Sequence, residues 1–191
     1  EPALINLGGG ELLVVMRTGR FSPMYQTRSL DGGRTWQKPM STHVLGLSPQ
    51  IVLLPSGILV CSFGWRPLKY QYSNGRKDER GPYPAAARDY QKRYLKDVGI
   101  SDPSAAAGDY VMVSRDKGQT WDPPRQIAPP LTSGYTLLLA TGQDTALVLS
   151  SRLTLPGKSL ENVSRIWENK WSEWKEKVVI LREVRQISLK Q

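Results

Sequence analysis

An eight-residue pattern occurs twice in this chain. Residues 29–36 read SLDGGRTW and residues 114–121 read SRDKGQTW, and each copy follows a run containing apolar residues. The positions kept in both copies are Ser29, Asp31, Gly33, Thr35 and Trp36 in the first, and Ser114, Asp116, Gly118, Thr120 and Trp121 in the second. Asp can accept hydrogen bonds from its own turn, Gly adopts positive φ, and Trp is a large anchor. The repeat therefore predicts two equivalent turns between strands.

The spacing Ser-x-Asp-x-Gly-x-Thr-Trp resembles the Asp-box, or BNR repeat, of the sialidase (neuraminidase) superfamily. Members of that superfamily are six-bladed β-propellers with four-stranded blades. The resemblance implies that each box lies on the turn between the third and fourth strands of a blade, away from the catalytic face. We expect Asp31 and Asp116 to have a structural role, because such carboxylates bind their own backbone.

Paired strands around the two boxes give the blade pattern. Each blade starts with an apolar strand, continues through a Gly-marked turn, and returns in a second apolar strand. The expected strand pairs are 3–7 with 11–17, 49–54 with 58–63, and 134–139 with 145–149. Continuous apolar runs fit strands that neighbouring blades cover on both faces. The sequence predicts an all-β fold with about three blades of a six-bladed sialidase-like propeller, over residues 1–155.

Two segments fall outside this strand pattern. An insertion at about residues 67–108 carries helix formers over 84–98, which predict a loop and a short helix. In the tail, residues 156–191, apolar residues recur at helical spacing after Ser159. We expect a helix over about 160–176, with its Trp residues packed in the core rather than forming a sugar platform, and then a closing strand over 178–189 of the same domain.

Three blades make only half of such a ring, and open strand edges favour association. The interpretation that fits best is a C-terminal portion of a longer propeller, in which N-terminal blades complete the ring. A second copy of the chain is the alternative.

Composition adds limits on partners. At 191 residues, with 39% hydrophobic and 23% charged residues, the chain is typical of a globular protein, and no apolar run reaches the roughly 20 residues of a membrane span. The net charge of +9 would attract anions. No nucleic-acid module accompanies it, so nucleic acid is not the expected partner and solvated surface charge is the simpler interpretation.

No cofactor or metal is expected from the sequence. The single His43 has no ligand spacing around it, and Gly8, Gly9 and Gly10 lie between strands rather than before a helix. A lone Cys61 excludes an internal disulfide framework and leaves the compartment open. The sialidase resemblance slightly favours a secreted or periplasmic protein.

The resemblance extends to three candidate site residues. The segment from Glu1 to Gly19 is similar to the sialidase segment in which a Glu opens one strand and an Arg closes the next. In active sialidases that Glu assists a Tyr nucleophile, and the Arg belongs to a trio that binds the substrate carboxylate. This implies Glu1 as base and Arg17 as binder, since the guanidinium fork matches a carboxylate. Residues 132–136 resemble the stretch that presents the nucleophile, here Tyr135.

Structural alternatives remain for these residues, and the family pattern is incomplete. Arg17 also fits an interblade salt bridge, and Tyr135 a hydrogen-bonded core residue. Residues 107–109 read AGD where a third Arg is expected, and Ser150 and Ser151 replace an acidic residue. Arg66 and Arg28 are possible cationic substitutes. The resemblance implies that a general acid Asp and a first Arg come from upstream blades.

Two main hypotheses for function follow. The first is a sialidase-like glycoside hydrolase that acts on an exo-terminal sugar, of acidic type, in a glycan or glycoconjugate; it requires Tyr135, Glu1 and Arg17 to converge. The second is a non-catalytic carbohydrate-binding or scaffold propeller, in which exposed aromatic residues would stack on sugars: Trp65, Tyr70, Tyr72 and Tyr83. A basic nucleic-acid binder, a third possibility, would lose affinity steeply with salt.

Overall fold

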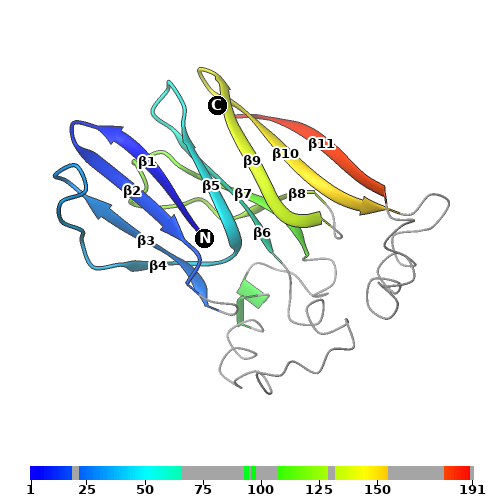
Figure 1. The fold of residues 1–191 in the computed structure, drawn as a ribbon, viewed down its shortest axis with the longest axis horizontal. Coiled ribbons are helices and arrows are strands. Elements are labelled where there is room, and N and C mark those ends of the chain that lie inside the picture. The colour runs from blue at the N-terminus through cyan, green and yellow to red at the C-terminus, as the bar shows by residue number, and fades with distance from the viewer. Residues whose placement is uncertain are drawn as a thin grey trace.

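The described residues form three antiparallel sheets (Figure 1). The computed structural model describes residues 1–18, 22–65, 93–94, 96–97, 107–128, 132–154 and 179–189. The first sheet contains β1 (Pro2–Gly8), β2 (Glu11–Met16), β3 (Pro23–Ser29) and β4 (Met40–Leu45) in that order. The second contains β5 (Leu47–Leu53), β6 (Leu59–Trp65), β7 (Gly108–Ser114) and β8 (Arg125–Ala128). The third has the order β11 (Val179–Ser188), β10 (Thr145–Thr154) and β9 (Thr132–Gly142).

The sheets stand side by side, and their first strands are neighbours. Strand β5 packs between β1 of the first sheet and β9 of the third. Each sheet starts at this inner strand and continues outward through strands in chain order, as Figure 1 shows for the blue, the cyan to green, and the yellow to red strands. This is the arrangement of propeller blades, and it confirms the all-β fold and the three strand pairs expected from the sequence.

Burial follows from the position of each sheet. In the middle sheet every residue of β6 and β7 is buried, because neighbouring sheets cover both faces. Phe63 and Cys61 face a core shared with the first sheet, whereas Val60 and Val111 face a core shared with the third. In β1, by contrast, Ala3 and Leu7 are buried, Ile5 is half-buried and the alternate residues are exposed, as expected of a strand with one covered face.

The two turn repeats have matching hydrogen bonds. In the first, Asp31 Oδ1 accepts from Thr35 N at 2.9 Å and from Ser29 Oγ at 2.8 Å, and Asp31 Oδ2 accepts from Thr35 Oγ1 at 2.6 Å. Asp116 makes the same three contacts in the second repeat. Hydrogen bonds from Thr35 and Ser29 lower the pKa of Asp31 to about 2. Both repeats connect the third and fourth strands of a sheet and brace their own turns.

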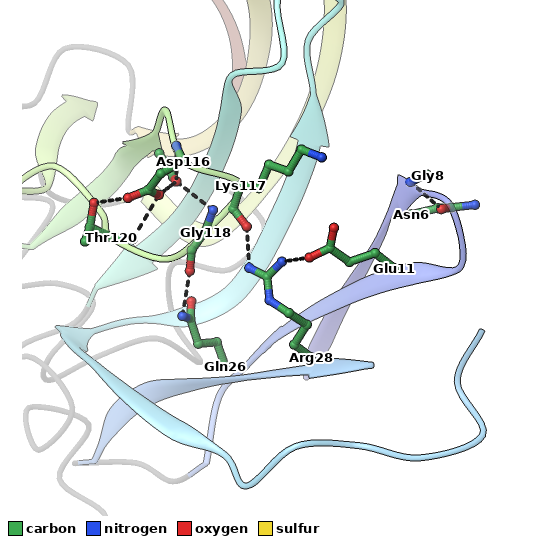
Figure 2. Close-up of polar contacts among 10 residues, drawn as sticks. Asn6, Gly8, Glu11, Gln26, Arg28, Asp116, Lys117, Gly118 and Thr120 are labelled. Carbon is green, nitrogen blue, oxygen red and sulfur yellow. Dashed lines mark hydrogen bonds and ion pairs between the residues drawn. The ribbon is translucent and has the colours of Figure 1, made fainter. Parts of the chain in front are cut away.

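The second turn repeat, residues 114–121, also docks on the first sheet (Figure 2). Buried Gln26 of β3 donates from Nε2 to Gly118 O at 2.8 Å and accepts at Oε1 from Trp121 Nε1 at 2.7 Å. Nearby, Arg28 donates to Glu11 and to the Lys117 carbonyl. A turn of the second sheet is therefore held by side chains of the first, in addition to the apolar core between the two sheets.

The remaining predicted segments are only partly described. Residues 93–94 and 96–97 are helical, within the range expected to form a short helix. The helix expected over 160–176 lies outside the described residues. The expected closing strand is confirmed as β11, Val179–Ser188. None of the described helical residues belongs to a segment with the length and hydropathy of a membrane crossing.

Gly118 provides a test of the docking of the second turn repeat. Its φ is +84°, and a Cβ there would lie 2.6 Å from Leu13 Cδ2 of the first sheet. Gly57 has φ +85° with nothing within 4 Å of the same position. We expect Gly57→Ala to lose about 1 kcal/mol of unfolding free energy from backbone strain alone. Gly118→Ala should lose a further 1–3 kcal/mol, roughly, because Leu13 is buried and must shift.

Urea unfolding of both variants measures this difference. Equal losses in the two variants would contradict the close contact between the second turn repeat and the first sheet.

Candidate functional site

The two ends of the sheets differ in what they carry. The Gly8–Gly10 turn and the first turn repeat lie at one end of the first sheet, where Gly32 N donates to Gly10 O at 2.8 Å. Because Pro2 pairs with Met16, Glu1 and Arg17 lie at the opposite end. We call this the Glu1 end, and the other the turn-repeat end. In Figure 1 the label N marks the Glu1 end of β1.

Glu1 and Arg17 form an ion pair at the Glu1 end. Arg17 NH1 donates to Glu1 Oε2 at 2.9 Å and to Oε1 at 3.1 Å, and their backbones are joined by Arg17 N to Glu1 O at 3.1 Å. The side chains are 25% exposed for Arg17 and 39% for Glu1. The pair is thus open to solvent but held by two strands of one sheet.

A backbone group of the second sheet completes the contacts of Glu1. Ser48 N donates to Glu1 Oε2 at 3.1 Å. Ser48 has φ 50°, an uncommon value for a residue other than Gly, and lies where the β5–β6 register shifts between Leu47 and Gln50. The bulged start of β5 thus brings a backbone N–H to a carboxylate of the neighbouring sheet.

Glu1 is held in its charged form by these partners. Desolvation by burial acts to raise the pKa of Glu1, but the hydrogen bond and charge of Arg17 and the Ser48 N–H outweigh it, and the pKa is lowered. Glu1 is therefore a carboxylate at neutral pH, able to accept a proton or a hydrogen bond.

Tyr135 lies near the start of β9, on the open face of the third sheet. Its neighbours face the second sheet: Thr136 Oγ1 lies 2.7 Å from Ser62 Oγ, and a Cβ on Gly64 would lie 2.3 Å from Gly134 Cα. Since side chains alternate along a strand, Tyr135 points the other way, and it is 53% exposed. Gly64 pairs with Leu47 at the start of β5, so Tyr135 lies at the same end of the sheets as Glu1.

Of the other two predicted cations, only Arg28 is among the described residues. Arg28 lies opposite Leu13, toward the turn-repeat end, where it pairs with Glu11. Arg66 falls outside the described residues. The structure therefore brings Glu1 and Arg17 into contact, sets Tyr135 at the same end, and places Arg28 elsewhere.

The prediction that Trp65 is an exposed residue that stacks on sugars is wrong. Trp65 is only 6% exposed, and its ring packs edge-on against Tyr94 at 5.2 Å and against Tyr110 at 6.2 Å between centroids. It is a core residue at the Glu1 end. Tyr70, Tyr72 and Tyr83 lie outside the described residues.

Sequence reasoning missed Ser48 and the nature of Asp109. Nothing in the sequence marks the Ser48 N–H as a partner of Glu1. A residue before a proline favours extended backbone with negative φ, whereas Ser48 has φ 50°. Asp109, which stands near the place of the expected third Arg, is fully buried opposite Gly64. This chain therefore has a buried Asp where the sequence resemblance predicts an Arg.

Among the described residues, one groove of about 400 Å³ lies at the turn-repeat end. Its polar lining includes Glu11, Gln26, Arg28, Lys38 and Gln119. These are largely the residues that join the first sheet to the second turn repeat, so the groove follows that junction rather than the Glu1 end. The described part of the chain contains no cluster of three or more His, Cys, Asp or Glu side chains suited to a metal ion.

Comparison with solved structures gives similarity at the level of the fold. A protein of unknown function from Dyadobacter fermentans aligns with 97% of this chain and 50% of its own, at 15% identity and a TM-score of 0.51. An α-L-arabinofuranosidase of family GH93 from Fusarium graminearum, solved with arabinobiose, aligns over 100% of this chain and 48% of its own, at 14% identity and a TM-score of 0.43. A Hadza microbial sialidase aligns over 80% of this chain and 33% of its own, at 16% identity and a TM-score of 0.42.

The chain spans about half the length of the first of these structures. No protein-family model and no curated protein sequence matches it. The Dyadobacter fermentans protein supports the fold described above.

The Arg17 guanidinium can be tested as the cause of the lowered pKa of Glu1. We expect the pKa of Glu1 to rise in Arg17→Ala, because desolvation then acts without the hydrogen bond and charge of the guanidinium that oppose it. A pH titration of the Glu1 side-chain carboxyl carbon by NMR measures the shift. Arg17→Lys keeps the positive charge and should give a smaller rise. An unchanged titration in Arg17→Ala would contradict the ion pair.

Proposed function

We propose that this chain carries part of the active site of a sialidase-like exo-glycosidase. The observation that carries the proposal is the Glu1 carboxylate, held between the Arg17 guanidinium and the Ser48 N–H at the end of the sheets where Tyr135 also lies. A carboxylate, a guanidinium and a phenol around the inner strands are the groups that the sialidase resemblance assigns to proton transfer, substrate binding and nucleophilic attack.

Tyr135 is the proposed nucleophile. Its phenolic oxygen would attack the anomeric carbon while the glycosidic C–O bond breaks, which forms a covalent glycosyl-enzyme intermediate. The phenolic proton would pass to Glu1, whose lowered pKa keeps it ionised. This step requires the Tyr135 side chain, which points away from the second sheet, to turn toward the Glu1 carboxylate. A general acid outside the described residues would protonate the leaving oxygen, and water would then release the sugar.

Arg17 is the proposed substrate binder. Its guanidinium can present parallel N–H groups to a sugar carboxylate, or single donors to hydroxyl groups. Arg66 stays a second candidate for this role. Arg28 is a weaker candidate, because its guanidinium is engaged by Glu11 and by the Lys117 carbonyl at the turn-repeat end.

The proposed substrate is an exo-terminal sugar of a glycan or glycoconjugate, and an acidic sugar fits Arg17 best. The net charge of +9 on the chain would attract an anionic sugar, and a phenol is less repelled by that sugar than a carboxylate nucleophile would be. No cofactor is part of this proposal.

A non-catalytic carbohydrate-binding or scaffold propeller is the second candidate. What favours it is the incomplete set of cations: buried Asp109 stands near the place of a third Arg, and Arg17 already has Glu1 as a partner. A binder needs neither a nucleophile nor a base, so it would tolerate loss of the Tyr135 hydroxyl.

Turnover of aryl glycosides by the chain and by Tyr135→Phe separates the two candidates. The panel should include sialosides, and arabinofuranosides because an arabinofuranosidase is among the similar structures. We expect cleavage of an acidic glycoside, with kcat at least about 100-fold lower in Tyr135→Phe. Tyr25→Phe, which removes a phenol from β3 of the first sheet, is the matched control and should keep wild-type activity.

Cleavage that survives in Tyr135→Phe would contradict the role of that phenol. If the intact chain cleaves no glycoside but binds one of them, the binding module is supported instead.

A further inference from the structure

The last residues of β6 lie between the two parts of the candidate site. In the second sheet, Gly64 pairs with the residue of β5 that directly precedes Ser48, and the Ser48 N–H donates to Glu1. From the third sheet, Gly134 approaches the same glycine so closely that a Cβ on Gly64 would lie 2.3 Å from Gly134 Cα. Gly134 directly precedes Tyr135. Gly64 therefore contacts the chain one residue before Ser48 and one residue before Tyr135.

The backbone that carries Tyr135 is a bulge in the third sheet. Residues 133–135 of β9 lie opposite the single residue Ser151 of β10, between two regularly paired positions. Gly134, inside the bulge, has φ 73°. Because a bulge disrupts the hydrogen-bond ladder locally, β10 alone does not fix the backbone at Tyr135.

Two contacts with the second sheet hold this backbone on either side of Tyr135. Before it, Gly134 packs on Gly64 with no space for a side chain between them. After it, Thr136 Oγ1 lies 2.7 Å from Ser62 Oγ, and the two residues are only 4% and 0% exposed. A buried hydrogen bond specifies position closely, since leaving either group without a partner is costly. The second sheet thus supplies the constraint that the bulge removes from the third.

The interface between the second and third sheets changes character at this place. Elsewhere its buried side chains are apolar, as at Val60, Val111 and Val148. At the Glu1 end the buried residues facing this interface include glycines, hydroxyl side chains and one Asp: Ser62, Gly64, Asp109, Gly134, Thr136 and Ser150. Two apolar groups of the same shape would stabilise the packing about as well as the hydroxyl pair does. The hydroxyl pair therefore favours a role in alignment.

We propose that Ser62 and Gly64 of β6 are positioning residues for the candidate site. Ser62 fixes the strand directly after Tyr135, so the phenol turns toward Glu1 by rotation of its side chain on a fixed backbone. Gly64 sets how closely the start of β9 approaches the bulge that carries Ser48. The catalytic consequence rests on the proposed function, whereas the structural dependence of Tyr135 on β6 does not.

NMR of the chain with ¹³C-labelled tyrosine tests the role of Ser62 without any substrate. The Tyr135 ring signals are assigned by their loss in Tyr135→Phe. We expect these signals to shift in Ser62→Ala and in Thr136→Val, which remove one hydroxyl each. Thr136→Ser keeps the hydroxyl and should leave the signals near their wild-type positions.

Ser29→Ala is the matched control for Ser62→Ala. Ser29 is 1% exposed, and its hydroxyl is also hydrogen-bonded, but it belongs to the first turn repeat. This variant should be less stable to urea and leave the Tyr135 signals unchanged. Equal shifts in Ser29→Ala and Ser62→Ala would overturn the proposal, because the effect would then follow from lost stability alone.

Gly64→Ala separates the two positioning roles. The added methyl group collides with the Gly134 backbone, so we expect the Tyr135 signals to shift and, because the Ser48 N–H also moves, the pKa of Glu1 to rise. Ser62→Ala should leave the Glu1 titration unchanged. An unchanged Glu1 titration in a folded Gly64→Ala variant would contradict the role of Gly64. If that variant does not fold, Ser62→Ala and Thr136→Val still test the role of Ser62.

Kinetics on a cleaved glycoside test the catalytic consequence. We expect kcat to fall about 10-fold or more in Ser62→Ala, with KM within about threefold of wild type, because misplacement of a reacting group affects the chemical step. Unshifted Tyr135 signals in Ser62→Ala and Thr136→Val, or shifted signals with unchanged kcat, would overturn the proposal. Shifted signals in a chain that cleaves no glycoside would support the dependence of Tyr135 on β6 and contradict the proposed glycosidase.

Discussion

The buried amide of Gln26 joins the first two sheets, and much of the structure depends on that junction. Both ends of the amide are satisfied across the interface, by the Gly118 carbonyl and by the Trp121 indole. A buried amide without partners would be costly, so the position of the second turn repeat relative to β3 is closely specified. Gly118 allows the approach, since any side chain there would collide with Leu13. The apolar core between the two sheets stabilises their packing, and these polar contacts fix how the second turn repeat is aligned on β3.

That alignment has consequences at the opposite end of the sheets. Glu1 belongs to the first sheet and accepts a hydrogen bond from Ser48 of the second, so its geometry depends on how the two sheets are set against each other. The position of Tyr135 depends on how the third sheet packs on the second, because its neighbours contact that sheet: Thr136 contacts Ser62 and Gly134 contacts Gly64. The turn repeats thus act at a distance from the candidate site. They fix the sheets, and the sheets bring functional side chains of separate sequence segments to one end.

The sequence was most informative where chemistry is local. The turn repeats could be predicted because Asp31 and Asp116 bind atoms within four residues, and the strand pairs because apolar runs and Gly turns are local signals. Contacts between sheets could not be predicted in this way. Arg28 is a candidate binder in the sequence, yet its partners Glu11 and Lys117 lie 17 and 89 residues away. Trp65 resembles a stacking platform in the sequence, but its burial depends on Tyr94 and Tyr110. The contact of Ser48 with Glu1 arises from a bulge that no motif marks.

A double-mutant cycle between Gln26 and Trp121 tests the junction most directly. Gln26→Leu and Trp121→Phe each remove one side of the 2.7 Å hydrogen bond while keeping much of the side-chain volume. The unfolding free energies of the wild type, the two single variants and the double variant give the coupling energy. The account predicts a coupling of about 0.5–3 kcal/mol, as for residues in one hydrogen-bond network. Additive effects, with a coupling of roughly zero, would contradict the claim that Gln26 holds the second turn repeat on the first sheet.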